Sequence, residues 1–307
     1  MTLPSLAVTL GDPRGIGAEL LRTALPQIQE EYPGIGVHLL GDATTLGEGP
    51  WPGATLHPTG RFDGSLASAG EISTQAIRQG VALIQEGEAQ ALVTAPVHKP
   101  ALQAAGVHHP GQTEFLQELT GAPAVGMLMT ARTTRLGSHP LRILLATTHL
   151  PLRDVPDRIT RELLVAQMSL LDQDLRRHWS LSDPVLGLCG LNPHASDGGL
   201  FGDEEARVME PALQELRDQG VAAQGPFPAD TIFLKAVGGE LDAVVSPTHD
   251  VGMAVFKTLA FGRGVNATLG LPFLRTSPDH GTAFELAGTG RADPGSTLEA
   301  LRLAAGL

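Results

Sequence analysis

The sequence predicts an α/β protein in which short buried strands alternate with amphipathic helices. Short apolar runs recur along the chain, segments with helical spacing lie between them, and Pro and Gly gather at the connections. With 307 residues and 42% hydrophobic content, the chain can bury the core of two domains or of one large domain. The apolar runs are Leu6 to Leu10, Val37 to Leu40, Ala91 to Thr94, Ile143 to Thr147, Val185 to Leu188 and Ala243 to Ser246.

Helical spacing is clearest in two segments between these runs. From Arg161 to Leu175, apolar side chains recur at intervals close to 3.6 residues, and the segment from Asp203 to Leu216 has the same pattern. Consecutive acidic residues open the second segment, where the positive end of a helix dipole favours them. A further helix is expected to begin near Ala18.

Composition excludes several classes of partner and location. The net charge of −12 argues against nucleic acid, because phosphate backbones are bound by clustered Lys and Arg. No apolar run approaches the roughly 18 residues needed to cross a bilayer, and Met1 to Leu10 shows no targeting pattern. We therefore expect a cytoplasmic protein with no membrane partner. The single cysteine, Cys189, lies in an apolar run and is interpreted as a buried structural thiol.

The segment from Gly11 to Gly17, GDPRGIG, leads from the first predicted strand into a helix. Backbone amides at such a helix start suit an anionic ligand. The spacing is not that of the dinucleotide fingerprint G-x-G-x-x-G. Two interpretations stay open, a ligand-binding turn and a plain tight turn.

Three histidines follow predicted strands directly: His149, His194 and His249. In open α/β sheets, ligands bind at the carboxyl ends of the strands. Three imidazoles meeting there would bind a divalent metal and leave positions open for a substrate. The alternative is that each is a hydrogen-bonded loop residue. The other histidines considered, His38, His57, His108, His109, His139 and His178, are assigned to edge, loop or surface positions.

The C-terminal third places cations among glycines in an apolar context. Lys257, Arg263 and Arg275 occur there with Asn266 and His280. Glycines let the backbone approach a ligand, and Lys and Arg supply charge and forked donors for phosphate or carboxylate. We favour a ligand site over a solvated loop, because the rest of the chain is acidic.

Several motifs, taken in order, resemble the 4-hydroxythreonine-4-phosphate dehydrogenase family of pyridoxal phosphate biosynthesis. The resemblance runs from residue 6 to 303, nearly the whole chain, and its last motif is long. The motifs are GDPRGIG, TAPVHK, GQTEF, TTHLPLRDVP, GLNPHASDGG, PFPADTIF, PTHDVG and FGRGVNATLGLPFLRTSPDHGTAFELAG.

The resemblance implies a fold similar to the isocitrate and isopropylmalate dehydrogenases, with two α/β domains and the active site in the interdomain cleft. It implies a first domain of residues 1–125 and 250–307 and a second, dimer-forming domain of residues 126–249. It also implies a homodimer whose active site takes residues from both subunits. NAD, or NADP, would then be bound without a dinucleotide fingerprint, in agreement with the spacing at Gly11 to Gly17.

The same resemblance implies roles for individual residues. The metal, zinc, cobalt or magnesium, would be bound by His149, His194 and His249. The phosphorylated substrate would contact Gln112, Thr113, Lys257, Asn266 and Arg275, and Asp230 and Asp250 would lie near the metal.

The implied reaction is oxidation of 4-phosphohydroxy-L-threonine to a β-keto acid, which decarboxylates to 3-amino-2-oxopropyl phosphate. Lys257 would donate a proton or neutralise the substrate, and Lys99 is either a further site residue or a surface lysine at a helix start.

Two positions depart from the family pattern. Gln112 stands where the family usually has His, and Val251 where it usually has Gln. A glutamine donates a hydrogen bond but carries no imidazolium charge, so phosphate affinity or its pH dependence should differ. A relative that oxidises another phosphorylated four-carbon hydroxy acid is therefore an alternative.

Two other classes of function remain. Three histidines near Asp230 and Asp250 would equally activate water in a metal-dependent hydrolase or phosphatase. A phosphometabolite-binding protein without catalysis would use only the segment from Lys257 to Arg275. Reduction of the nicotinamide cofactor distinguishes the dehydrogenase from both.

Overall fold

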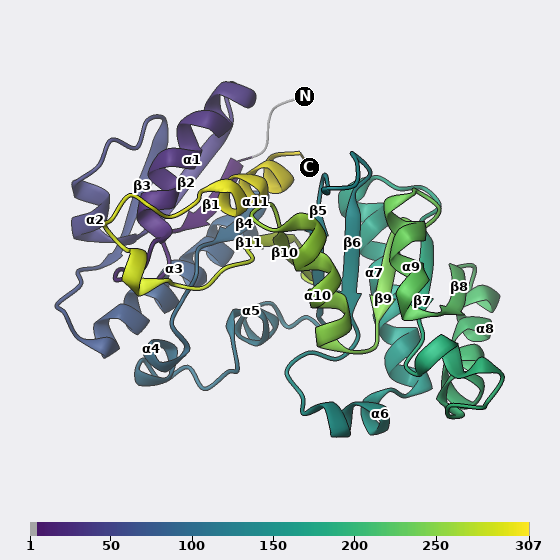
Figure 1. The fold of residues 1–307 in the computed structure, drawn as a ribbon. Coiled ribbons are helices and arrows are strands. Elements are labelled where there is room, and N and C mark those ends of the chain that lie inside the picture. The colour runs from purple at the N-terminus through teal and green to yellow at the C-terminus, as the bar shows by residue number, and fades with distance from the viewer. Residues whose placement is uncertain (1–4, 307) are drawn as a thin grey trace. The chain divides into compact units, whose positions relative to one another are not determined.

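The computed structural model describes residues 5–306 and divides into two compact α/β units (Figure 1). The first unit combines the chain up to Val125 with the chain from Val265 onward, and the second comprises Gly126–Gly264. The chain thus returns to the first unit at Val265, whereas the domain boundary expected from the sequence is at residue 250. The segment between them belongs to the second unit because α10 (His249–Ala260) contacts β6 and β9 of that unit.

The first unit is a mostly parallel sheet in the order β3-β2-β1-β4-β11-β10. Only β10 runs antiparallel to its neighbour β11. Its strands are β1 (Ser5–Thr9), β2 (Gly36–Asp42), β3 (Ala54–Gly60), β4 (Ala91–Thr94), β10 (Val265–Leu269) and β11 (Leu274–Pro278). Its longer helices are α1 (Gly17–Glu31), α3 (Leu66–Gln85), α5 (Gln112–Thr120) and α11 (Gly295–Ala305), and its short ones are α2 (Ala43–Gly47) and α4 (Lys99–Ala104).

The second unit has the strand order β5-β6-β9-β7-β8. An antiparallel hairpin joins β5 to β6, and the other pairs are parallel. Its strands are β5 (Gly126–Ala131), β6 (Leu141–Leu145), β7 (Val185–Cys189), β8 (Ala222–Phe227) and β9 (Ala243–Ser246). Besides α10, its helices are α6 (Val155–Arg158), α7 (Arg161–Trp179), α8 (Glu210–Asp218) and α9 (Ala229–Val237).

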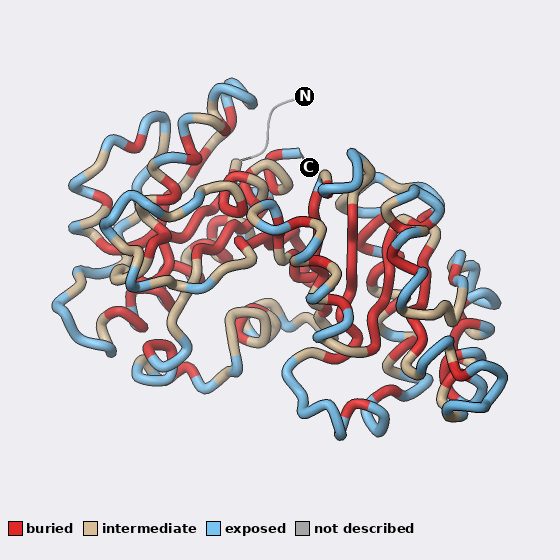
Figure 2. The backbone as a smooth tube through the Cα atoms, in the orientation of Figure 1, coloured by how far each residue is buried: buried red, intermediate tan, exposed pale blue. Residues whose placement is uncertain are grey.

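Each unit has its own hydrophobic core between the sheet and its helices. In the first, Ile77 of α3 and Phe115 of α5 pack in a cluster with Leu92 of β4. In the second, Phe256 of α10 packs in a cluster with Ile143 of β6 and Val244 of β9. Figure 2 shows the consequence: the inner strands are mostly buried, the edge strands β3 and β8 are partly exposed, and the helices expose their outer faces.

The predicted α/β class and the strands predicted from apolar runs are confirmed, since each run contains or overlaps a strand. The unpredicted strands β3, β5, β8, β10 and β11 contain polar residues, Gly or Pro, so their patterns are weaker. The helix expected from Asp203 instead begins with a π-helical turn at Glu205–Met209 that leads into α8.

His178 is half-buried rather than on the surface, and burial, with the charge of Arg177, lowers its pKa to about 4. No helix within residues 5–306 is long and apolar enough to cross a membrane.

Candidate functional site

The three strand-end histidines all lie in the second unit. Strands β6, β9 and β7 are adjacent and parallel, so their carboxyl ends meet at one edge of the sheet. His149 follows β6, His194 follows β7, and His249 is the first residue of α10 after β9. This is the edge at which open α/β sheets bind ligands.

His149 and His249 form a pair at this edge. Their ring centroids are 5.6 Å apart. The Nδ1 of His249 lies 2.9 Å from a carboxylate oxygen of Asp250, so a proton on Nδ1 would be donated to that carboxylate. Such a contact sets the tautomer that leaves Nε2 as an acceptor for a metal. The donor set therefore fits a first-row divalent ion.

His194 lies in an unusual loop after β7. Its φ is 55°, and the next three residues also have positive φ values, up to 70° at Ser196. A run of non-glycine residues in this region is strained unless the surroundings hold it. Within residues 5–306, no group of three His, Cys, Asp or Glu side chains is close enough to hold a metal, so His194 does not join the other two histidines within one chain.

The loop that carries His194 is held by the buried carboxylate of Glu205. This carboxylate accepts hydrogen bonds from the backbone amides of Leu191 and Asn192 at 2.9 and 2.7 Å, from the Asn192 side chain at 2.9 Å, and from Ser196 Oγ. Burial raises the pKa of Glu205, but the hydrogen bonds from Asn192 and Ser196 outweigh it and hold the pKa below its usual value. Glu205 is therefore an ionised anchor for the loop.

The first unit contains a buried cation, Arg275. Arg275 on β11 is only 3% exposed, and its guanidinium donates to Thr94 Oγ1 at 2.7 and 3.1 Å and to Thr268 Oγ1 at 3.0 Å. Burial lowers the pKa of Arg275 to about 10, partly offset by the charge of Glu114. Among the described residues, the hydrogen-bond partners of this guanidinium are hydroxyl groups alone, and the charge of Glu114 offsets only part of the cost of burial. An anionic ligand would therefore stabilise it.

Two buried acceptors without donors belong to the same unit. Gln112 Oε1 and Asn266 Oδ1 have no hydrogen-bond partner within residues 5–306, although the Gln112 amide donates to Ala95 O at 3.3 Å. Asn266 shares a face of the sheet with Thr268, the partner of Arg275. Buried acceptors are normally satisfied, so these two indicate contacts that a ligand would complete.

The remaining predicted residues lie elsewhere or are exposed. Lys257 belongs to α10 in the second unit, with its amino group 6.0 Å from the ring centroid of Phe261. Asp230 is exposed in the first turn of α9, and Asp250 is exposed beside His249. Thr113 is half-buried in the first turn of α5.

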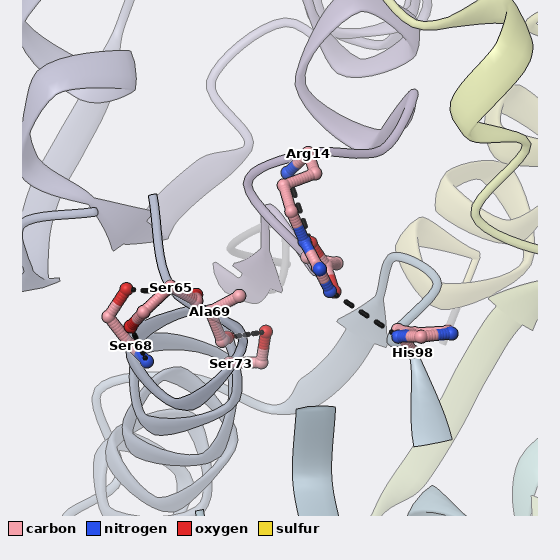
Figure 3. Close-up of polar contacts among 7 residues, drawn as sticks. Arg14, Ser65, Ser68, Ala69, Ser73 and His98 are labelled. Carbon is pink, nitrogen blue, oxygen red and sulfur yellow. Dashed lines mark hydrogen bonds and ion pairs between the residues drawn. The ribbon is translucent and has the colours of Figure 1, made fainter. Parts of the chain in front are cut away.

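The glycine-rich segment after β1 has the geometry of a tight turn. Gly11 has a φ of +75°, and a Cβ at this position would lie 2.4 Å from Pro96 O. Arg14 donates to the Asp12 carboxylate at 2.9 and 2.7 Å and points toward His98, with a separation of 3.4 Å (Figure 3). The same view shows the serines at the start of α3, where the Ser65 hydroxyl caps the helix by accepting from the Ser68 amide.

The sequence and the structure both match known proteins over nearly their whole length. The family model described as pyridoxal phosphate biosynthetic protein PdxA matches residues 51–304. A 4-hydroxythreonine-4-phosphate dehydrogenase from Chromobacterium violaceum is 43% identical, over 98% of this chain and 96% of that protein.

The chain belongs to the PdxA family.

Solved structures agree with this membership. The 4-hydroxythreonine-4-phosphate dehydrogenase from Klebsiella pneumoniae matches with a TM-score of 0.86 and 35% identity, over 99% of this chain and 97% of that one. An isocitrate dehydrogenase from Methylococcus capsulatus, 14% identical, matches with a TM-score of 0.55 and so shares the fold alone. These matches confirm the predicted family, the isocitrate-dehydrogenase-like fold and the dehydrogenase class.

The PdxA fold also reveals residues that the sequence patterns missed. Thr94 and Thr268 accept from Arg275, and Glu205 anchors the His194 loop. Thr94 ends an apolar run, the same strand-end position that identified the histidines. No sequence pattern pointed to a role for Glu205, because the helix dipole already explains an acidic residue at the start of a helix.

Proposed function

We propose that this PdxA-family protein oxidises 4-phosphohydroxy-L-threonine with NAD or NADP and that the resulting β-keto acid loses carbon dioxide to give 3-amino-2-oxopropyl phosphate. The observation that carries the proposal is the buried, poorly compensated Arg275, which would bind the substrate phosphate. Relatives named 4-hydroxythreonine-4-phosphate dehydrogenase support the choice of substrate. A cytoplasmic location fits such a metabolite.

The proposed metal, zinc, cobalt or magnesium, would be held by His149, His194 and His249. The proximity of His149 and His249 and the contact of His249 with Asp250 support this set. When bound, the ion supplies Lewis acidity at the substrate hydroxyl. Asp250 would orient the imidazole by accepting its Nδ1 proton.

The chain's own residues would then bind the substrate and move its protons. Asn266 would accept from a substrate hydroxyl or ammonium group through its unpaired oxygen, Gln112 would place its amide group beside the phosphate, and Thr113 would add a hydroxyl contact. Lys257 would supply the proton that replaces the departing carboxylate, or neutralise that carboxylate. Asp230 would take part in proton transfer near the metal ligands.

The proposed active form is a homodimer with an active site built from both subunits. One observation supports a shared site: His149 and His249 are paired, yet no third ligand joins them within residues 5–306 of one chain. His194 of the partner subunit would complete the set. Homodimers with two-fold symmetry are also the commonest soluble assembly.

The presence of glutamine rather than histidine at position 112 favours one alternative, in which the substrate is a different phosphorylated four-carbon hydroxy acid. A neutral amide interacts with a phosphate dianion less strongly than an imidazolium does. The alternative keeps the same reaction class and the same metal.

The deciding experiment follows cofactor reduction by purified, metal-reconstituted protein with 4-phosphohydroxy-L-threonine and NAD. Reduced cofactor that disappears after chelation and in His249→Ala supports the proposal. Reduction that survives both treatments contradicts the metal site. If cofactor and metal bind but nothing is reduced, the substrate assignment fails, and other phosphorylated four-carbon hydroxy acids should be screened.

A further inference from the structure

An open cavity of about 420 Å³ lies within the second unit, where α10 ends. Its walls come from the β5–β6 hairpin, the last turn of α10 and the segment after it. Small-molecule sites typically have volumes of about 300–1,000 Å³. The lining residues are Thr134, Arg135, Leu259, Ala260, Phe261 and Arg263.

The charge of this cavity contrasts with that of the chain. The protein has a net charge of −12, yet the only charged residues among the six that line the cavity are Arg135 and Arg263. Both arginines are exposed. The Arg263 guanidinium donates to Thr133 Oγ1 at 3.1 Å, and neither arginine forms an ion pair with a carboxylate within residues 5–306. Most of their donors are therefore left for a ligand.

The two guanidinium groups are not there to bind the free carbonyl groups at the C-terminal end of α10. Helix ends leave carbonyl groups that cations often satisfy. Here backbone amides do so: Arg135 N donates to Leu259 O at 2.9 Å, and Arg263 N donates to Ala260 O at 3.0 Å. The guanidinium groups are not needed for this purpose.

An aromatic ring lines the same cavity as the two arginines. Phe261 is 69% exposed, a high value for a phenylalanine. A ligand with a planar ring would cover this face, while its anionic group would meet the forked donors of the arginines.

The cavity is separate from the histidine pair. Helix α10 begins at His249 and ends at Ala260. At a rise of 1.5 Å per residue, its two ends are about 16 Å apart. A ligand in the cavity would therefore not touch His249.

We propose that this cavity is a binding site for a small phosphate ester that carries a planar ring. Arg135 and Arg263 bind the phosphate, and Phe261 packs on the ring. The cavity shares no lining residue with the proposed substrate site, although the amino group of Lys257 lies 6.0 Å from the Phe261 ring centroid. Binding in the cavity does not depend on the proposed reaction.

The test is titration calorimetry with pyridoxine 5′-phosphate, which has the required chemistry and no aldehyde to react with lysines. It is performed on the wild type and on Arg275→Met, because the latter lacks the proposed phosphate site of the substrate. We expect one site per chain in Arg275→Met, and at least about a tenfold loss of affinity in Arg135→Gln and in Arg263→Gln. The matched control is Arg207→Gln, which removes an exposed arginine paired with Asp203 and should not change binding.

Inorganic phosphate separates the two parts of the site. Phe261→Ala should weaken pyridoxine 5′-phosphate toward the affinity of inorganic phosphate while leaving the latter unchanged. Turnover without the ligand should be the same in Arg135→Gln as in the wild type. The proposal is overturned if pyridoxine 5′-phosphate does not bind at millimolar concentration, or if both arginine variants bind it as tightly as the wild type.

Discussion

At the scale of single residues, the balance between burial and compensation differs between Arg275, the proposed phosphate ligand, and the structural Arg302. Within the described part of the chain, the buried Arg275 donates hydrogen bonds only to hydroxyl groups, whereas Arg302 donates to the carboxylates of Glu31 and Glu299. The first arrangement is costly to the folded protein and would be compensated by the proposed anionic ligand, and the second is an ordinary stabilising network. The two arginines should therefore respond in opposite ways to the same substitution.

We expect Arg275→Met to fold with an unchanged or higher free energy of unfolding, by up to about 2 kcal/mol, because it removes a buried charge. The same change should lower kcat/KM by at least about 100-fold, since a charged partner of the phosphate is lost. Thermal unfolding and steady-state kinetics measure the two effects. Arg302→Met is the control and should lose stability but retain activity; a large loss of stability in Arg275→Met would contradict a functional origin for this buried cation.

Gln112→His should add to KM a pH dependence beyond that of the wild type. An imidazole gains charge as the pH falls through about 6.5, so KM for the phosphorylated substrate should fall roughly three- to tenfold between pH 8 and pH 6.5. The ratio of variant to wild-type KM at each pH removes the ionisation of the substrate itself. A constant ratio across this range would show that position 112 does not contact the phosphate.

At the scale of elements, loops at strand ends position the three candidate metal ligands. The ends of β6 and β9 bring His149 and His249 together, whereas His194 depends on a strained loop anchored from outside by Glu205. The charge on Glu205 stabilises the fold above the pKa of an unfolded glutamate, and this contribution is lost as the pH falls through the lower folded pKa.

Glu205→Ala should lower the free energy of unfolding by about 2 kcal/mol, because several buried donors lose their acceptor. It should also weaken metal binding about 10- to 100-fold, since the His194 loop loses its support. Thermal unfolding and competition with a fluorescent chelator measure the two quantities. Glu205→Gln, which keeps an acceptor oxygen, should be milder in both; equal metal affinity in all three proteins would mean that the loop does not hold a ligand.

At the scale of the whole molecule, the proposed active site requires two copies of the chain. Co-expression of His194→Ala with His249→Ala tests this directly, because each variant alone should be inactive. In a mixed dimer, one site would combine His149 and His249 of one subunit with His194 of the other, all intact. Random pairing should then restore about a quarter of wild-type activity. No recovery, despite mixed dimers of the two tagged chains, would place all three ligands on a single chain.

Local patterns in the sequence were sufficient for the α/β class, for the strands that read as continuous apolar runs and for the histidines that follow them. These features depend on periodicity and on neighbours in the chain, so they are visible without a fold. The long motif from Phe261 to Gly288 likewise carried the family.

Tertiary structure alone decided the rest. A strand with a polar, glycine-containing sequence such as β8 forms because the neighbouring strand β7 supplies its hydrogen bonds. Arg275 meets Thr94, and Glu205 reaches back to Asn192, only after the chain has folded. The burial of a charge and the lack of a partner for it are properties of the packed molecule, and they are what distinguish a ligand site from a surface residue of the same type.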